Sequence, residues 1–413
     1  MTRVGIARFA ALAVALLFVA CQSTARPSGS PRPDAPSAVG PSSPPVLGVD
    51  WGRAAQLDRP ENFMQSVPPD YLSDHPILRI AGQATMSDVV SGSGRIVSVG
   101  YAPPDWVPIS WTSADGESWA IHSIGSAKHT FPVAVASGPG GGFVAVGRSE
   151  KRPVAWTSPD GATWTEHAIP ILGSDDIAER MTTIVATPAG FVAGGSVGPE
   201  LSDRHARIWR SADGATWERV PDDAAAFADA EVRSIASIDG GLVAVGVVGN
   251  VQHPTGAVAW VSKDGGTWTR IDDPSFVGGV AVSAIAVPFG GLVAVGSTLD
   301  RGEAIVWRSA DGRSWARAEG GTGFRDPGFV WMTDVVAVDD TVIAIGDYQP
   351  NQRGTAVSWT SRDGESWTRA APAPVQEQAE FSAIARGGPG AIAVGVFGLP
   401  DSFVPTVWLT PGH

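Results

Sequence analysis

Short apolar segments that end in glycine recur along most of the chain. They are rich in Val, Ile and Phe, and they occupy residues 94–100, 142–147, 190–195, 241–246, 291–296, 341–346 and 390–395. A segment of this length suits a buried strand and is too short for a helix. A second apolar run precedes each one, with turn residues such as Asp239-Gly240 between them. Each pair of runs therefore predicts a β-hairpin.

A nonapeptide of the form Trp-x-Ser-x-Asp-Gly-x-(Ser/Thr)-Trp follows these hairpins. Its six full copies are Trp111–Trp119, Trp156–Trp164, Trp209–Trp217, Trp260–Trp268, Trp307–Trp315 and Trp359–Trp367, and a seventh begins at Trp408 without reaching its second Trp. Successive first tryptophans are 45, 53, 51, 47, 52 and 49 residues apart, which indicates one supersecondary unit per period. Four antiparallel strands in each period predict an all-β, seven-bladed β-propeller.

The fourth strand of the seventh blade is expected from the other end of the chain. Residues Val49–Ala55 match Glu365–Ala371 at one Trp, one Arg and two Ala positions. Trp51 would then supply the second Trp that the seventh copy lacks. We therefore expect an N-terminal strand that pairs with the C-terminal blade and closes the ring, which leaves no unpaired edge between the first and last blades.

The nonapeptide resembles the Asp-box of the bacterial-neuraminidase (BNR) repeat propellers, a family that includes sialidases, sortilin-like receptors and photosystem-assembly propellers. The resemblance covers all seven periods, although the common family pattern has one more residue after the Asp. In such a turn the Asp accepts backbone N–H groups, the Gly takes a positive φ and the aromatic ring packs beneath. The resemblance places these Asp residues on the face away from the binding mouth, as structural groups: Asp115, Asp160, Asp213, Asp264, Asp311 and Asp363.

The first 21 residues have the features of an export signal. Arg3 and Arg8 flank its start, and an apolar stretch runs from Phe9 to Ala20, shorter than the roughly 20 residues that span a bilayer. The sequence Phe18-Val19-Ala20-Cys21 resembles the lipobox of bacterial lipoproteins, in which the Cys is acylated after cleavage. Ordinary secretory cleavage is the alternative.

Three segments follow from this reading: a lipoprotein-type signal peptide at 1–21, a Ser/Pro-rich flexible tether at 22–48 and the propeller at 49–413. Cys21 is the only cysteine, so a disulfide within the chain is impossible. We expect a protein anchored to the cell membrane through lipidated Cys21, facing the extracytoplasmic side, or else secreted.

Composition narrows the choice of partners. Fifty Gly and 33 Pro in 413 residues suit a turn-dense all-β protein. The net charge is −13 and no basic stripe appears, so nucleic acid is not expected as a partner. The seven His residues include no pair at the spacing of zinc ligands, so we expect neither a metal nor another cofactor.

Candidate ligand-binding residues lie in the loops expected around the channel mouth. Aromatic side chains mixed with Arg and other polar groups are typical of a wet interface with a protein or glycan. A solvated loop without a ligand is the alternative at each position. The candidates are Arg79, Tyr101, Trp106, Arg204, His205, Trp331, Tyr348 and Arg353.

Two acidic residues, Asp88 and Asp334, begin equivalent inner strands of the first and sixth blades. They are candidates for a carboxylate pair across the channel, of the kind that glycoside hydrolysis needs. The simpler interpretation, which we favour, is that they are solvated channel residues.

A sialidase-like glycoside hydrolase is the alternative function. As the resemblance implies, sialidases use three arginines on the substrate carboxylate, a Tyr nucleophile activated by a Glu, and an Asp acid/base. Leu78-Arg79-Ile80-Ala81 is similar to the motif of the first arginine, but only Arg79 and Ile80 match. Sialidases also have six blades, where seven are expected here. We therefore expect a monomeric, non-catalytic binding or assembly module for a protein or glycan.

Overall fold

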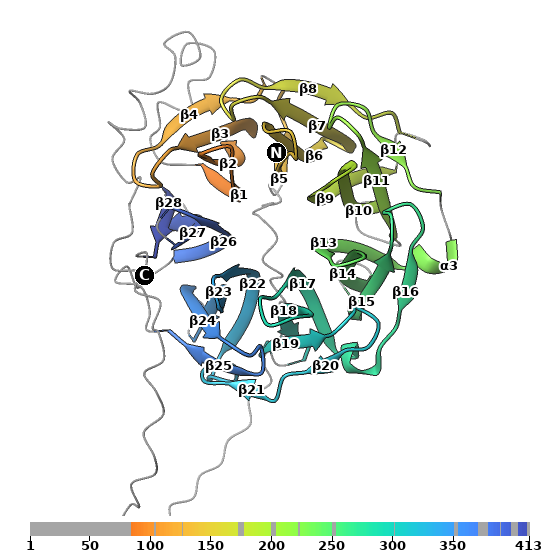
Figure 1. The fold of residues 1–413 in the computed structure, drawn as a ribbon, viewed down its shortest axis with the longest axis vertical. Coiled ribbons are helices and arrows are strands. Elements are labelled where there is room, and N and C mark those ends of the chain that lie inside the picture. Colours follow the sequence, from red (N-terminus) through yellow and green to blue (C-terminus); the bar gives the residue numbers. More distant parts are fainter. Residues whose placement is uncertain are drawn as a thin grey trace, which may run out of the picture. The chain divides into compact units, whose positions relative to one another are not determined.

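Seven β-sheets surround a central axis in the computed structural model of the protein (Figure 1). The structure describes residues 84–102, 105–125, 127–171, 177–199, 204–221, 224–249, 253–300, 302–350, 354–370, 379–388, 390–397 and 404–410. Within these ranges the helical elements are α3 (Ala224–Phe227) and a 3-10 helix at Pro274–Phe276. The molecule is a seven-bladed β-propeller, which confirms the fold class predicted from the sequence.

The strands of a blade follow one another along the chain, from the channel outwards. Blade 1 contains β1 (Thr85–Gly92), β2 (Arg95–Ala102), β3 (Val107–Ser113) and β4 (Ala120–Ser123). Blade 2 contains β5 (Thr130–Ser137), β6 (Phe143–Ser149), β7 (Arg152–Ser158) and β8 (Thr165–Ala168). Blade 3 contains β9 (Ala178–Thr187), β10 (Gly190–Gly198), β11 (His205–Ser211) and β12 (Glu218–Arg219). Blade 4 contains β13 (Ala230–Ile238), β14 (Gly241–Gly249), β15 (Pro254–Ser262) and β16 (Thr269–Ile271).

Blades 5 to 7 continue the pattern around the ring. Blade 5 contains β17 (Gly279–Ala286), β18 (Leu292–Thr298), β19 (Ala304–Ser309) and β20 (Ala316–Arg317). Blade 6 contains β22 (Phe329–Val338), β23 (Thr341–Gln349), β24 (Thr355–Ser361) and β25 (Ser366–Arg369), with β21 (Gly320–Gly321) parallel to β25. Blade 7 contains β26 (Ala379–Gly387), β27 (Gly390–Phe397) and β28 (Val404–Leu409). The strands within each blade pair antiparallel.

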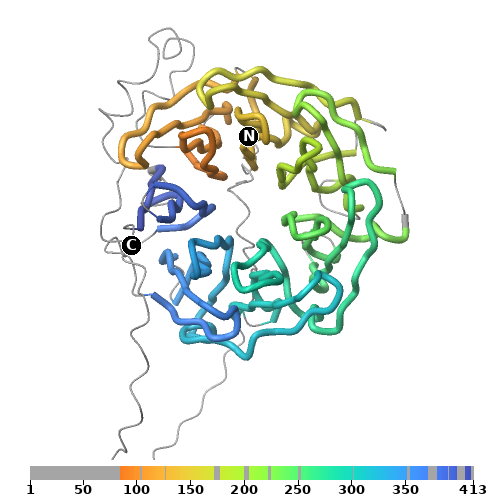
Figure 2. The backbone as a smooth tube through the Cα atoms, in the orientation of Figure 1, coloured from red at the N-terminus to blue at the C-terminus, as the bar shows by residue number. Residues whose placement is uncertain are grey.

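The first and last blades pack against each other, so the ring is closed (Figure 2). Strand β1 contacts both β26 and β27. A Cβ added to Gly116 of blade 1 would lie 2.9 Å from Leu409 Cδ2 of blade 7. The closing strand expected at Val49–Ala55 lies outside the described residues, so three strands of blade 7 are described.

The core is divided among the interfaces between blades. The described residues form seven hydrophobic clusters, and each cluster joins residues of two neighbouring blades. Each cluster contains the first Trp of one nonapeptide, with no more than 1% of its surface exposed: Trp111, Trp156, Trp209, Trp260, Trp307, Trp359 and Trp408. The repeated Trp is therefore the residue that fills each interface.

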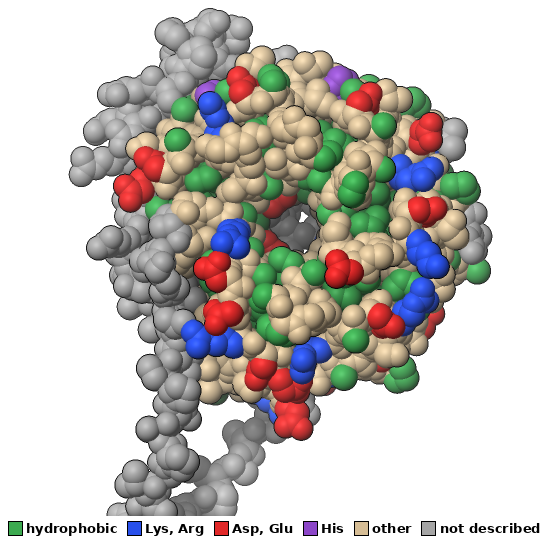
Figure 3. Space-filling view, viewed as in Figure 1, with side chains coloured by type: hydrophobic (Ala, Val, Ile, Leu, Met, Phe, Trp, Pro, Cys, Tyr) green, Lys and Arg blue, Asp and Glu red, His purple; other side chains and the backbone are tan. Residues whose placement is uncertain are grey.

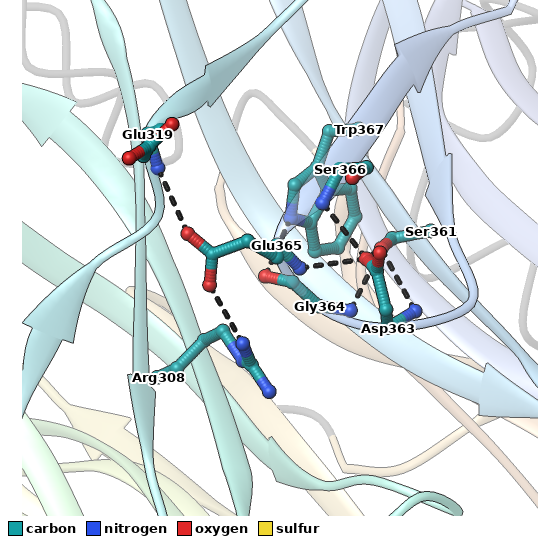
Figure 4. Close-up of polar contacts among 8 residues, drawn as sticks. All are labelled: Arg308, Glu319, Ser361, Asp363, Gly364, Glu365, Ser366 and Trp367. Carbon is teal, nitrogen blue, oxygen red and sulfur yellow. Dashed lines mark hydrogen bonds and ion pairs between the residues drawn. The ribbon is translucent and has the colours of Figure 1, made fainter.

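The nonapeptides form the turns between the third and fourth strands (Figure 4). In the copy of blade 6, Asp363 Oδ1 accepts hydrogen bonds from the backbone N–H groups of Glu365 (2.8 Å) and Ser366 (2.7 Å). Trp367 Nε1 donates to the carbonyl of Gly364, whose φ is 71°. The other five copies repeat this Trp-to-Gly bond.

These turns also join neighbouring blades. Glu365, beside the blade 6 turn, accepts a 2.6 Å hydrogen bond from Arg308 Nη1 and a 3.2 Å bond from the backbone N–H of Glu319 (Figure 4). Arg308 lies in β19 of blade 5, and Glu319 lies in the connection that follows this blade. The carboxylate of each of the six box Asp residues accepts at least one backbone N–H group of its own turn.

Every inner strand carries a β-bulge at the same position. The register between first and second strands shifts by one residue at Ser87, Val133, Thr182, Arg233, Val282, Thr333 and Ser382. The bulge brings a backbone carbonyl of the inner strand over a glycine of the second strand. A Cβ on Gly246, for example, would overlap the carbonyl oxygen of Glu231. This overlap explains the glycine that ends each apolar segment of the sequence.

Candidate functional site

The end of the ring opposite the nonapeptide turns is the mouth of the channel. Because the strands of a blade alternate in direction, the inner strands begin there and the second strands end there. The inner strands start earlier than their apolar runs indicate: β9 begins at Ala178, whereas the predicted run covers 183–186. Near the start of three of these strands lie charged residues that belong to the mouth: Glu179 and Arg180 in β9, Glu231 and Arg233 in β13, and Glu380 in β26. Figure 3 shows the central opening from one face, with acidic side chains in its wall.

Four arginines of blades 2 to 4 interact electrostatically at the mouth, and three of them act on the carboxylate of Glu231. Arg204 Nη1 bonds Glu231 Oε2 in a buried ion pair, and Arg233 Nε lies 3.6 Å from Glu231 Oε1. The charge of Arg180 acts on Glu231, and the charge of Arg148 acts on Arg180. We call Arg148, Arg180, Arg204, Arg233 and Glu231 the arginine cluster. Four guanidinium groups and one carboxylate give it a net charge of +3 in a chain of net charge −13.

Burial and neighbouring charges shift the pKa values of Arg180 and Glu231 in the arginine cluster. Burial lowers the pKa of Arg180 to about 10, Glu231 opposes this, and the charges of Arg204, Arg148 and Arg233 lower it further. Burial favours the neutral form of Glu231, but Arg233, Arg204 and Arg180 hold its pKa below the usual value. Arg180 Nε is buried without a hydrogen-bond partner in the described part of the chain. Such an N–H group can donate a hydrogen bond to an anionic ligand atom.

Three aromatic rings of blades 1 and 2 form a second group at the mouth, which we call the aromatic cluster. The Tyr101 ring lies 5.6 Å from the Trp106 ring and 5.1 Å from the Phe131 ring, in edge-to-face contacts. The Trp106 and Phe131 rings are 6.0 Å apart. Tyr101 is buried, whereas Trp106 and Phe131 are partly exposed.

Blades 6 and 7 place an acidic pair at the mouth. Asp347 is 3% exposed, and its carboxylate accepts hydrogen bonds from the Trp331 side chain and the Phe381 backbone. Burial raises the pKa of Asp347 well above its usual value, and the charge of Glu380 raises it further. Burial also raises the pKa of Glu380. The mouth therefore carries positive charge on blades 2 to 4 and carboxyl groups on blades 6 and 7.

The channel wall holds a belt formed by the residue that follows each bulge. This channel belt consists of Asp88, Ala134, Thr183, Ser234, Ser283, Asp334 and Ala383. Asp88 Oδ2 accepts from the backbone N–H of Val135 at 2.8 Å, and Asp334 Oδ2 from that of Ile384 at 2.9 Å. The interpretation of Asp88 and Asp334 as merely solvated residues was wrong, because each carboxylate ties its own blade to the next.

Burial raises the pKa of Asp88 to about 7; the Val135 N–H opposes the shift, and Asp334 adds to it. Burial raises the pKa of Asp334 as well, against a hydrogen bond from Ser283 Oγ at 2.6 Å. The two carboxyl groups thus influence each other, yet both are occupied by structural hydrogen bonds.

The structure brings some of the predicted site residues together and separates others. Tyr101 and Trp106 meet in the aromatic cluster, Arg204 joins the arginine cluster, and Trp331 contacts Asp347. His205 is exposed at the start of β11. Tyr348 donates its hydroxyl to the Pro327 carbonyl, and its ring lies 4.6 Å from the Arg369 guanidinium carbon. Arg79, Arg353 and Cys21 lie outside the described residues.

Several residues of the mouth were not predicted from the sequence, because the candidates were expected in loops and these residues lie in strands. Arg180, Glu231, Arg233 and Glu380 lie within inner strands, and Asp347 lies near the end of a second strand. The sequence signal that could have identified them is a charged residue at the edge of an apolar β-run. Charges at such positions are desolvated and are retained only with specific partners.

The described ranges show neither a metal-binding cluster nor a membrane-spanning helix. They contain no group of three or more His, Cys, Asp or Glu side chains that could hold a metal ion. No helix among them is long and apolar enough to cross a membrane.

Neither a protein-family model nor a curated relative matches the chain. Among solved structures, YCF48 bound to a D1 peptide is 14% identical with a TM-score of 0.52, over 80% of this chain and 93% of that one. A puromycin hydrolase complexed with PGG is 15% identical with a TM-score of 0.51, over 77% of this chain and 50% of that one. The sialidase of Trypanosoma rangeli in complex with sialic acid is 12% identical with a TM-score of 0.44, over 80% and 54%.

The likeness to the first two structures shows a shared propeller fold and nothing finer. The chain spans about half the length of the puromycin hydrolase and sialidase chains. Nothing about substrate or partner follows from either.

Proposed function

We propose that the protein is a non-catalytic binding module, an Asp-box propeller anchored to the cell membrane and facing the extracytoplasmic side. Its ligand presents an anionic group to the arginine cluster. The observation that carries the proposal is the partly buried guanidinium group of Arg180, which lies among the charges of Arg148, Arg204 and Arg233 and whose Nε has no hydrogen-bond partner among the described residues. A charged group that is desolvated without a full set of partners is costly to keep, and such a group marks a functional site.

Two further observations support binding over hydrolysis. The Tyr348 hydroxyl donates to a backbone carbonyl and so is not paired with an activating glutamate. The channel carboxylates Asp88 and Asp334 hold backbone N–H groups of neighbouring blades. A peptide is the favoured ligand class, in keeping with the propeller YCF48, which was solved bound to a D1 peptide.

The test measures binding of charged probes to the purified full chain in detergent. Acetylated and amidated octapeptides that contain four Glu residues should bind, and Lys-containing counterparts should not. Arg180→Gln removes one cationic partner and should weaken acidic-peptide binding by about tenfold to a hundredfold, since charge-assisted hydrogen bonds contribute about 1.5–3 kcal/mol. Rising salt should weaken the binding of the unaltered protein.

Arg386→Gln is the matched control. Arg386 is 65% exposed at the side chain and pairs with Asp339, at the end of the ring opposite the mouth. It should leave peptide binding unchanged. Equal affinity of the unaltered protein and Arg180→Gln would contradict the proposal, as would the absence of any acidic-peptide binding. Turnover of a fluorogenic sialoside would favour the glycosidase instead.

A further inference from the structure

Trp106 has a backbone conformation that a bulky residue rarely adopts. Its φ is 55°, in the left-handed region. The segment at the start of blade 2 holds it there. Thr130 N–H donates to the Trp106 carbonyl at 3.0 Å, and His129 N–H donates to the Asp105 carbonyl at 2.8 Å. Strain that the surroundings enforce in this way is found mainly at functional sites. Here it positions one indole ring against Tyr101 and Phe131 at the mouth.

The aromatic cluster is continuous with the arginine cluster through one residue. The guanidinium carbon of Arg148 lies 4.6 Å from the centre of the Phe131 ring, within the range of a cation–π contact. Arg148 also lowers the pKa of Arg180 in the next blade. A ligand held by the arginines therefore has the aromatic rings beside it, one blade further around the mouth.

Trp106 and Phe131 are the rings of this cluster that an aromatic side chain of a ligand can reach. Tyr101 is buried and packs against both, inclined by 61° to Trp106 and by 76° to Phe131. The partly exposed Trp106 and Phe131 rings are inclined by 35° to each other. An aromatic side chain makes edge-to-face contacts with such an arrangement, each contributing about 0.5–1.5 kcal/mol.

We propose that the aromatic cluster is a second subsite, which takes an aromatic side chain of a peptide whose acidic residues contact the arginine cluster. This inference rests on the proposed function and specifies the ligand: a peptide segment with an aromatic residue within a few positions of its acidic residues. Trp106 and Phe131 would contact the aromatic side chain of the peptide, and Arg148 would lie between the two subsites.

The test compares two peptide series by calorimetry or, for weak binding, by saturation-transfer NMR. One series is acetyl-Phe-(Ser)n-Glu-Glu-amide with n from zero to three, and the other has Ala in place of Phe. The full chain should bind the best Phe peptide on the order of tenfold more tightly than its Ala counterpart. Trp106→Gly should remove this preference and leave the affinity for the Ala peptide unchanged. Gly adopts a positive φ without strain, so the backbone should be retained.

Arg180→Gln separates the inference from the proposed function. It should weaken both series by the same factor and keep the preference for Phe. If the unaltered protein binds both series equally, or if Trp106→Gly keeps the preference, the aromatic subsite is refuted while the arginine site stands. If neither series binds, the proposed function itself fails. A cooperative thermal transition of Trp106→Gly, even at a lower midpoint, checks that the variant is folded.

Discussion

The Asp88 carboxylate of blade 1 accepts a hydrogen bond from the backbone N–H of Val135 in blade 2, at 2.8 Å. The bond crosses the interface between the two blades, and the burial that accompanies it raises the pKa of Asp88 from 3.8 to about 7. Folding therefore makes this carboxyl group bind its proton more tightly. Its contribution to stability is present in full below pH 3.8 and is lost as the pH rises through about 7.

Asp88→Asn should accordingly stabilise the protein at pH 8. The Asn side chain carries no charge and keeps an acceptor for Val135 N–H, but its single carbonyl oxygen leaves Val89 N–H without its acceptor. The free energy of unfolding should therefore rise by about 2 kcal/mol, less than the roughly 4 kcal/mol that corresponds to the pKa shift alone. At pH 5 the gain should be smaller, because Asp88 is then largely protonated in the folded state. Urea denaturation at both pH values measures the difference. Asp88→Ala, which loses the acceptor, should destabilise at pH 5, and an equal gain for Asp88→Asn at both pH values would contradict the assignment.

Gly246→Ala should destabilise the fold by about 3 kcal/mol. The new Cβ would overlap the Glu231 carbonyl at the bulge, and relief of this overlap requires the inner strand to shift. Gly140→Ala is the control, since no atom lies within 4 Å of its added Cβ. Chemical denaturation of the two variants should give clearly different midpoints. Similar midpoints would show that the bulge is not what requires glycine at position 246.

The repeat predicted the architecture because the same physical need recurs seven times. Each interface between blades needs one large ring, each turn needs a carboxylate and a glycine with positive φ, and each bulge needs a residue without a Cβ. These requirements are local, so they are visible as a period in the sequence. The closing strand at Val49–Ala55 is the part of the fold that remains a prediction.

The mouth was less predictable because its residues differ from blade to blade. Arg204 and Trp106 were found because they lie beside loops, whereas Arg180 and Arg233 lie inside strands that the apolar pattern did not extend far enough to include. The arginine cluster also joins residues from three blades, and sequence spacing does not report which positions of different blades face one another. Periodicity reveals what the blades share and says little about where they differ.

Deletion of residues 1–55 should prevent cooperative folding, while deletion of residues 1–44 should be nearly silent. Among the other six blades a fourth strand pairs with the third, and in blade 7 the described partner of β28 is β27 alone. A strand at Val49–Ala55 would cover the remaining edge of β28, and its loss would expose that edge to aggregation. Thermal unfolding and light scattering compare the two truncations. Equal cooperativity in both would rule out this route of closure.

Cys21→Ser should release the protein from the membrane fraction or leave an unprocessed precursor. In the expected anchor, acylated Cys21 supplies all of the membrane affinity, so its loss should abolish membrane attachment. Fractionation of cells that express each form, with immunoblotting for size, makes the comparison. A processed protein that stays in the membrane fraction without Cys21 would refute the lipoprotein assignment.

The channel belt has alanine at two of its seven positions, Ala134 in blade 2 and Ala383 in blade 7, and an alanine side chain cannot form a hydrogen bond to the next blade. The joints between blades 2 and 3 and between blades 7 and 1 therefore lack the side-chain hydrogen bond that Asp88, Ser234, Ser283 and Asp334 of the belt form with the next blade. The first joint runs between Arg148 of blade 2 and Arg180 of blade 3. A peptide that contacts both arginines would add a link across a joint to which the belt side chain contributes none.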